Sequence, residues 1–421
     1  MNRDILNKII VWGARLILGG TFIISGWAKC VDLWGFVYKA EDYLAVWGMA
    51  SAVPREFTLV GAAALSMTEF CTGLMLALGC MRRGAAVIGT AIMAFMLPLS
   101  VYIAVENPVA DCGCFGDLLV ISNGATLAKN VILTALAVYL LYRNRRVAPL
   151  FVPGVQWIVL ALGIVYSLTV SVLGWQFQPV VDFRPFPVGS RLTAEAAGEG
   201  SEPVFVYEKE GRREEFAFDR LPDSTWTFVS AIHSRGSDRP DDSLAFFDDD
   251  GNEVTADVLE YGAQSGGLLL LTVPEPGYDN LTRARFANEL SDYAAAHDIA
   301  FAGVVAASEE TLGQWRALAR PHFEMYSASD TSLKQLVRGS MGLVWVRDGK
   351  IVLKRNFSNI DPDLLSRSEP LESLTVISDG HVATWLTAAL TAALILLWLT
   401  QHVFTRKNSP NSPAAPVKTS D

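Results

Sequence analysis

Two cysteines separated by one glycine are the residues of this chain with the clearest capacity for chemistry. They are Cys112 and Cys114, in the stretch DCGCFGD that spans residues 111–117. Cα atoms two residues apart reach up to about 7 Å, and a disulfide accepts about 4.4–6.8 Å, so the pair can close on itself. So small a ring is strained, and strained, exposed disulfides are the ones that exchange. The spacing therefore favours thiol–disulfide exchange at this pair.

A third cysteine, Cys30, is expected at the same membrane surface, and two roles for it stay open. In the redox alternative, Cys30 attacks either member of the pair while one of three thiols remains free. In the structural alternative, Cys30 forms a fixed disulfide with Cys112 or Cys114. A metal site is disfavoured, because Cys-x-Cys lacks the usual zinc spacing and no histidine lies in the first two outer loops.

The composition indicates a membrane protein, with the lipid bilayer as its first partner. Of the 421 residues, 51% are hydrophobic and 19% are charged, and the formal net charge is −10. This acidic balance argues against nucleic acid, which needs clustered Lys and Arg. A bilayer core takes about 20 apolar residues in a helix. Six segments come close to that length or meet it: Ile9–Ala28, Phe57–Cys80, Gly84–Val105, Thr126–Tyr142, Val155–Trp175 and Val382–Phe404.

Positive charges in the short loops predict the orientation. Arg82 and Arg83 lie between the second and third spans, and three arginines follow the fourth. Because Lys and Arg concentrate in cytoplasmic loops, both termini are expected in the cytoplasm of a bacterial cell, with the chain in the inner membrane. The cysteine pair and residues 176–380 are then expected in the periplasm, where disulfides persist.

Two charged residues near the pair are candidate accessory groups. Glu69 lies about halfway through the second span, where an ionised carboxylate is costly and marks a buried partner or a pathway. A helix-packing hydrogen bond is the alternative. Lys29, at the outer end of the first span, reaches Glu69 only if its stem turns inward, and an interfacial lysine that points outward is the favoured alternative. The aromatic segment 31–48 predicts an interfacial lid, with a quinone-facing surface as the less favoured version.

The membrane part resembles a known family. SGWAKCVDLWGFVYKAEDYL, TEFCTGLMLALG and CGCFGD followed by LAKNVILTALAVYLL are similar to the DoxX-like family that includes the methylamine utilisation protein MauE, over about the first 145 residues. The whole arrangement is similar to a longer, fused form found in Bacteroidetes. The resemblance implies a four-helix membrane core linked to redox or disulfide maturation of a client in the periplasm, and the DoxX relatives imply oxidation linked to a quinone. The motif positions are Cys112, Gly113, Cys114, Phe115 and Gly116, and Asp117 ends the same string.

The region after the fifth span predicts a small β region and then an α/β domain. Residues 203–229 alternate as a hairpin and a third strand, and residues 244–259 as another hairpin. Strand, helix, strand, helix and a hairpin turned by Asp348-Gly349 follow, which is the order of a thioredoxin-like fold. The expected divisions are 1–145 (MauE/DoxX-like core), 146–176 (fifth span), 177–237 (linker and β region), 238–362 (thioredoxin-like domain), 363–405 (linker and sixth span) and 406–421 (cytoplasmic tail).

The expected thioredoxin-like domain lacks the chemistry of a redox thioredoxin. PEPGYDN, residues 274–280, stands where Cys-x-x-Cys would lie, and Ser340-Met341-Gly342 stands where a cis-proline would lie. Without cysteine the domain cannot exchange dithiols. It is interpreted as a binding or positioning module whose Tyr278 and Met341 contact a client, and a fold kept only to cap the sheet is the alternative.

These features together favour a multi-pass inner-membrane protein that transfers electrons or disulfides to a periplasmic client. It would be a component of a thiol–disulfide oxidoreductase system. The alternative function is a membrane scaffold or small-molecule transporter whose cysteines form a structural disulfide.

Overall fold

The structure is a computed structural model that describes residues 3–109, 111–143, 149–192, 203–209, 212–217, 227–233, 244–307, 309–366, 370–375 and 379–407. The chain divides into two compact units, each described by itself. The first unit comprises Met1–Trp175, Pro179–Val181 and Ser378–Asp421, and the second comprises Gln176–Gln178 and Asp182–Ile377. Most of the predicted cytoplasmic tail, residues 408–421, lies outside the described residues.

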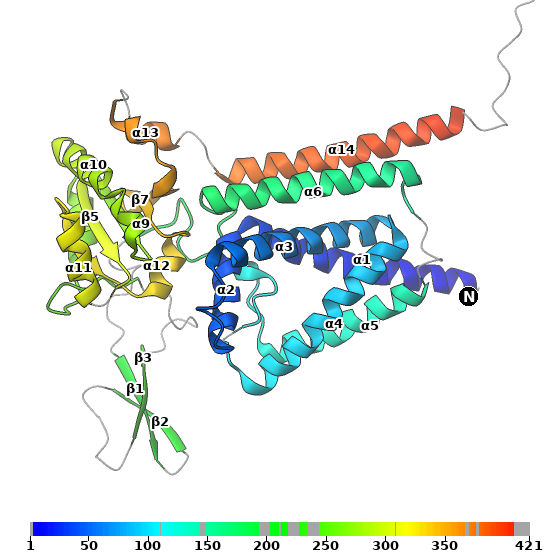
Figure 1. The fold of residues 1–421 in the computed structure, drawn as a ribbon, viewed down its shortest axis with the longest axis horizontal. Coiled ribbons are helices and arrows are strands. Elements are labelled where there is room, and N and C mark those ends of the chain that lie inside the picture. The colour runs from blue at the N-terminus through cyan, green and yellow to red at the C-terminus, as the bar shows by residue number, and fades with distance from the viewer. Residues whose placement is uncertain are drawn as a thin grey trace, which may run out of the picture. The chain divides into compact units, whose positions relative to one another are not determined.

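The first unit is a bundle of long helices. Within the described residues, six helices are long and apolar enough to cross a membrane, as the sequence predicts. They are α1 (Arg3–Val31), α3 (Arg55–Leu78), α4 (Arg82–Glu106), α5 (Asn123–Arg143), α6 (Pro153–Gln176) and α14 (Asp379–Lys407) (Figure 1). The shorter helix α2 (Leu33–Val46) follows α1, and its N-terminus is capped by the Asp32 side chain, which accepts from the Gly35 N–H.

Helices α1 and α3 pack backbone to backbone, and this close approach sets their register. A Cβ atom added at Gly26 would lie 2.5 Å from the Phe70 nitrogen, and one added at Gly73 would lie 2.6 Å from the Ile23 nitrogen. Only glycine permits such contact, as in small-residue interfaces between membrane helices. Because Gly26 lies against Phe70, the polar residues one turn away on α1 come to lie beside the neighbouring part of α3.

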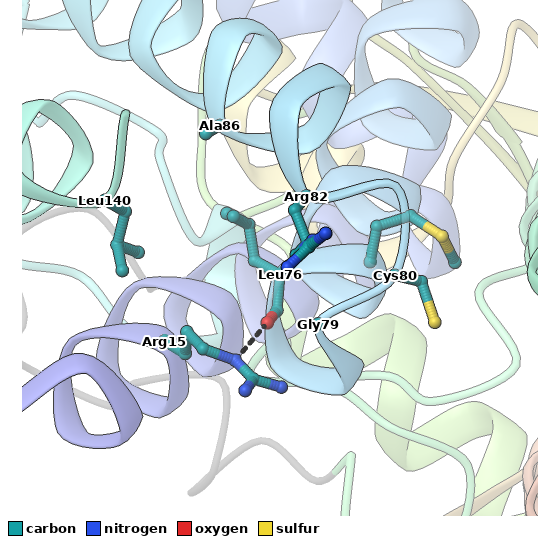
Figure 2. Close-up of a pocket in the computed structure, with 8 residues that line it drawn as sticks. Arg15, Leu76, Gly79, Cys80, Arg82, Ala86 and Leu140 are labelled. Atoms are coloured by element: carbon teal, nitrogen blue, oxygen red, sulfur yellow. Dashed lines mark hydrogen bonds between the residues drawn. The ribbon is translucent and has the colours of Figure 1, made fainter. Parts of the chain in front are cut away.

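The far end of α3 is capped by a side chain from α1. Arg15 donates from Nε to the Leu76 carbonyl at 3.1 Å and from Nη2 to the Ala77 carbonyl at 3.0 Å, and Figure 2 shows the first of these bonds. Gly79 ends the helix in the left-handed conformation. The last carbonyls of a helix have no partner within it and carry partial negative charge, so a buried guanidinium stabilises them.

The second unit contains a five-stranded mixed sheet in the order β6-β5-β4-β7-β8. Strands β4 and β5 and strands β5 and β6 pair in parallel, whereas β7 is antiparallel to both β4 and β8. The strands are β4 (Leu268–Val273), β5 (Ala300–Val305), β6 (Glu324–Ser327), β7 (Gly342–Arg347) and β8 (Lys350–Asn356). The strand–helix–strand–helix–hairpin order predicted from the sequence is present, with β6 and a further helix added before β7.

Helices cover both faces of this sheet. Helices α10 (Ala284–Ala296) and α11 (Glu309–Ala319) contribute to the core on one face, and α8 (Thr255–Gln264) and α12 (Asp330–Leu336) to the core on the other. Along β4, Leu269 and Leu271 face the first core while Leu268 and Leu270 face the second, which is the two-residue period of a strand buried on both sides. The Asp348-Gly349 turn has positive φ at both residues, as a tight hairpin requires.

Two parts of the second unit differ from the prediction or extend it. The expected hairpin over residues 244–259 is wrong in its second half: Phe247 and Glu253 form a single bridge, and α8 begins at Thr255. The Thr255 hydroxyl accepts the Phe246 N–H, and Val258 and Leu259 then pack on the sheet with helical spacing. A separate three-stranded antiparallel sheet, order β2-β1-β3, contains β1 (Pro203–Lys209), β2 (Arg212–Ala217) and β3 (Thr227–His233), as predicted.

Residues 182–192, expected as part of a linker, belong to the second unit. Their backbone runs beside β8, where the Gly189 N–H donates to the Ile351 carbonyl at 2.7 Å and the Leu192 N–H donates to the Gly349 carbonyl at 2.9 Å. Asp182 pairs with Arg184 at 2.7 Å and with Lys354 of β8 at 2.8 Å. We call residues 182–192 the edge strap. Its apolar side chains join the core that contains α8 and α12.

Candidate functional site

The cysteine loop between α4 and α5 brings two thiols into contact. The Sγ atoms of Cys112 and Cys114 lie 2.8 Å apart, and both residues are free thiols. Gly113 between them has φ +68°, and its N–H donates to Asp111 Oδ1 at 2.6 Å, which closes a tight turn. A disulfide bond measures about 2.05 Å, so only a small movement separates the dithiol from the bonded pair.

Helix α2 holds this loop from one side. Lys39 Nζ lies 3.2 Å from Asp111 Oδ2, and the Tyr43 hydroxyl donates to the Cys112 carbonyl at 3.2 Å. Cys112 also packs against Tyr43 and Ile103 in a small apolar cluster. The aromatic segment expected as an interfacial lid therefore contributes a helix that fixes the conformation of the cysteine loop.

A buried ion pair lies on the other side of the loop. Lys29 Nζ is 2.5 Å from Glu69 Oε2, and these side chains are only 1% and 6% exposed. Lys29 also donates to the Ser25 hydroxyl at 3.1 Å, and this hydroxyl donates to the Cys114 carbonyl at 2.5 Å. The favoured expectation that Lys29 points outward is thus wrong, because the close α1–α3 contact places its ammonium beside the carboxylate. Glu69 has the buried partner that its position suggested.

Cys114 lines a small cavity inside the bundle, together with several polar side chains. The cavity measures about 20 Å³, which is room for a single water molecule. Apolar side chains of α1, α4 and α5 form part of its lining, and the other lining residues are Thr21, Ser25, Lys29, Glu69, Cys114, Lys129 and Asn130. Lys129 was not predicted as a site residue, although a lysine inside an apolar span could have indicated one.

The other residues of the motif shape the loop. Phe115 is buried, and Lys129 Nζ lies 4.6 Å from its ring centroid in a cation–π contact. Gly116 has φ +54° and begins the 3₁₀ turn η1 (Gly116–Leu118). Asp117 lies in this turn and is exposed. These residues position Cys114 and its neighbours rather than adding further reactive groups.

The surroundings distinguish the two thiols electrostatically. The hydrogen bond from Cys112, together with the positive charges of Lys129 and Lys29, lowers the pKa of Cys114 to about 6, against the opposing effect of burial. The same hydrogen bond and burial raise the pKa of Cys112. Cys112 is 8% exposed, whereas Cys114 is partly exposed. The thiol of Cys114 is therefore the more acidic of the two, and Cys114 as a whole residue is the less buried.

Cys30 does not join this pair. It is buried on a different face of α1, beside Ser171 of α6 and near Cys71 of α3. Ser25 and Lys29 share one face because they are four residues apart, and Cys30 points about 100° further round the helix. The expected place of Cys30 at the outer surface, and its expected contact with Cys112 or Cys114, are therefore not supported by the structure.

The partner-binding residues expected in the second unit also need correction. Met341 is 2% exposed and belongs to the sheet core, so it cannot contact a client. The side chain of Tyr278 lies outside the described residues. The two segments expected at the position of a thioredoxin active site, residues 274–280 and 340–342, are joined by Asn280, which is buried and donates from Nδ2 to the Ser340 carbonyl at 3.0 Å. Asn280 was not predicted as a site residue.

Comparison with known proteins agrees with the resemblance of the membrane part. Residues 7–143 match the model of the family described as methylamine utilisation protein MauE, a range that includes α2 to α5, most of α1 and the cysteine loop. Residues 201–233, which include β1 to β3, match a domain of unknown function, DUF8463. No curated protein and no solved structure matches the chain.

Proposed function

We propose that this membrane protein carries out thiol–disulfide exchange through Cys112 and Cys114. The observation that carries the proposal is the 2.8 Å contact between the two Sγ atoms in a loop fixed from both sides. In the exchange, the Cys112–Cys114 dithiol is oxidised to a disulfide while a disulfide of a partner protein is reduced to two thiols, or the reverse. Two electrons and two protons pass between the pair and its partner, so no further reactant is needed.

The proposed partner is a disulfide-containing protein in the periplasm. The match to a family named for methylamine utilisation supports a role in the maturation of such a client. The arginine-rich loops support a position in the inner membrane with both termini in the cytoplasm and the cysteine loop outside. Disulfides form and persist in that compartment, which a periplasmic exchange reaction requires.

The second unit is proposed to have a thioredoxin-like fold and to hold the client. The order β5-β4-β7-β8, with two parallel strands followed by an antiparallel hairpin and with helices on both faces, supports this fold. The chain has no cysteine after Cys114. The unit therefore cannot exchange disulfides itself, and a binding role is proposed for it instead. The segment around Tyr278 is the proposed contact surface.

Trapping of mixed disulfides in intact cells tests the proposed reaction. Exchange proceeds through a disulfide between the protein and its partner, so removal of one cysteine of the pair should leave this intermediate unresolved. We expect Cys112→Ser or Cys114→Ser to accumulate a partner-linked species that reduction releases. The double variant should accumulate none, and Cys71→Ser, a matched control in the bundle core, should behave as the unmodified protein. A normally inserted protein that traps nothing through either cysteine would contradict the proposal.

A further inference from the structure

The charges around Cys114 come from several elements of the bundle. The charged and titratable groups described next to it are Cys112 of the loop, Lys29 of α1, Tyr43 of α2, Glu69 of α3 and Lys129 of α5. Two lysine ammonium groups and one carboxylate line the cavity itself. With both thiols protonated, the cavity wall has one net positive charge, and with one thiolate its charge is balanced.

The single carboxylate that lines the cavity forms an ion pair with only one of the two lysines. Glu69 lies 2.5 Å from Lys29 and shares no described ion pair with Lys129. Among the residues that the structure describes, no carboxylate lies within ion-pair distance of Lys129, whose ammonium group lies over the face of the Phe115 ring. An unbalanced charge inside a membrane span is costly. An anion at the adjacent Cys114 sulfur would compensate for it.

We propose that Lys129 is the counter-ion of a Cys114 thiolate, and that Cys114 is the sulfur at which the mixed disulfide with the partner forms. Cys112 is then the resolving thiol. Lys129 acts as a positioning residue, since it works through the Cys114 sulfur. This inference rests on the proposed exchange function and assigns different roles to the two cysteines. The position of Cys114 on the cavity lined by both lysines supports the assignment. The lowered pKa of its thiol agrees with it, and Cys114 as a whole residue is less buried than Cys112.

The assignment defines each step of the exchange. When the pair is reduced, the Cys114 thiolate attacks a partner disulfide, an S–S bond forms between Cys114 and the partner, and one partner thiolate leaves. Cys112 then loses its proton and attacks Cys114 Sγ, which closes the Cys112–Cys114 bond and releases the second partner thiolate. In the opposite direction, a partner thiolate attacks Cys114 Sγ and Cys112 leaves. A thiolate at Cys114 also favours the reduced pair, which makes the disulfide a better oxidant.

The pH dependence of alkylation tests the role of Lys129. The full-length reduced protein in lipid nanodiscs is treated with iodoacetamide between pH 5 and pH 9, and peptide mass spectrometry measures modification of each cysteine. Only the thiolate reacts. We expect Cys114 to react before Cys112, with a half-maximal rate near pH 6. Lys129→Gln should shift this midpoint upward by about one pH unit, which lowers the rate at pH 6 by about fivefold.

Two matched variants make the result specific. Lys129→Arg keeps the charge and should restore the midpoint, and Lys8→Met, which removes an exposed lysine elsewhere in the first unit, should leave it unchanged. A midpoint that is the same in Lys129→Gln and the unmodified protein would overturn the counter-ion role. Should Lys129→Gln fail to fold, alkylation of the unmodified protein still tests the assignment of Cys114 as the reactive thiol. Faster reaction of Cys112 would contradict it.

Partner capture separates failure of this inference from failure of the proposed function. Cys112→Ser, which leaves Cys114, should trap the partner, and Cys114→Ser should trap at least about tenfold less, since the remaining Cys112 is the weaker nucleophile at neutral pH. Trapping mainly through Cys112 would overturn the assignment while leaving exchange intact. Trapping through neither cysteine would remove the exchange function itself.

Discussion

Gly113 shows at the residue scale how the loop brings two sulfurs together. Its φ of +68° lies in the left-handed region, which costs a residue with a Cβ atom about 1–2 kcal/mol. A Cβ atom at this position would also lie 2.6 Å from Lys39 Cγ. Glycine is thus required by both backbone conformation and space, and the short Cys-Gly-Cys turn depends on it.

Replacement of Gly113 by alanine should slow closure of the disulfide. We expect Gly113→Ala to displace Lys39 or the turn and to reduce the rate at which Cys112 and Cys114 form a bond after a pulse of oxidant. Gly116→Ala is the matched control, because Gly116 also has positive φ but open space around it. Rapid-quench alkylation measures both rates. Equal closure rates in the two variants would contradict a specific role for Gly113.

The sequence predicted the approach of the two cysteines better than their surroundings. The one-residue spacing is a local property, so the approach of Cys112 to Cys114 could be predicted from chain geometry alone. The direction of Lys29 depends on how closely α1 approaches α3, and the nearness of Lys129 depends on the rotation of α5 towards the loop. Such tertiary facts leave no local pattern, and for this reason Lys29 was predicted wrongly and Lys129 was not predicted.

At the scale of elements, the edge strap depends on one carboxylate. Asp182 is 12% exposed and lies against both Arg184 and Lys354, each of which is almost fully buried. These two cations lower the pKa of Asp182 although burial opposes them strongly. Removal of the carboxylate would leave two buried positive charges without their shared partner. The free-energy cost of such unpaired buried charges exceeds the net stabilisation that the intact ion pairs provide.

Substitution of Asp182 should destabilise the second unit. We expect Asp182→Asn to lower its free energy of unfolding by about 3–5 kcal/mol, measured by urea titration of the full-length protein with tryptophan fluorescence. Because the folded pKa is lowered, the stabilisation is present above the ordinary carboxyl pKa of about 4 and is lost as the pH falls below it. The variant should therefore lose less stability on acidification than the unmodified protein.

An exposed carboxylate provides the control for this prediction. Asp292 pairs with His322 at the surface, where both side chains are more than half exposed. Asp292→Asn should change the free energy of unfolding by less than about 1 kcal/mol. Similar effects of the two substitutions would show that the Asp182 cluster does not stabilise the edge strap.

Elements with a clear period were predictable, and those defined by long-range contacts were not. The apolar run at 268–273 and the helical spacing in α10 gave the correct element types. Residues 182–192 have no such period, and the pair of Asp182 with Lys354 joins positions 172 residues apart. Helix α8 was missed because the strand-like alternation of apolar and polar residues ends at Thr255. The predicted hairpin was extended beyond this point, into the helix.

For the whole molecule, the account depends on which side of the membrane each part occupies. The arginines between α3 and α4 predict a cytoplasmic Arg83, and five spans before the α/β unit then predict a periplasmic Asp250. A reporter active only in the periplasm should be silent when fused after Arg83 and active when fused after Asp250. A cytoplasmic reporter should show the reverse. Periplasmic activity at Arg83 would contradict both the orientation and the compartment assigned to the cysteine pair.

The redox state of Cys112 and Cys114 in intact cells tests the central claim most directly. Cells are quenched in acid, free thiols are alkylated with a heavy reagent, disulfides are reduced, and the released thiols are alkylated with a light one. An exchanging pair should contain both thiol and disulfide, with a ratio that changes between aerobic growth and brief treatment with a membrane-permeant reductant and recovers after its removal. A pair that remains wholly oxidised under every condition would be a structural disulfide and would contradict the proposed function.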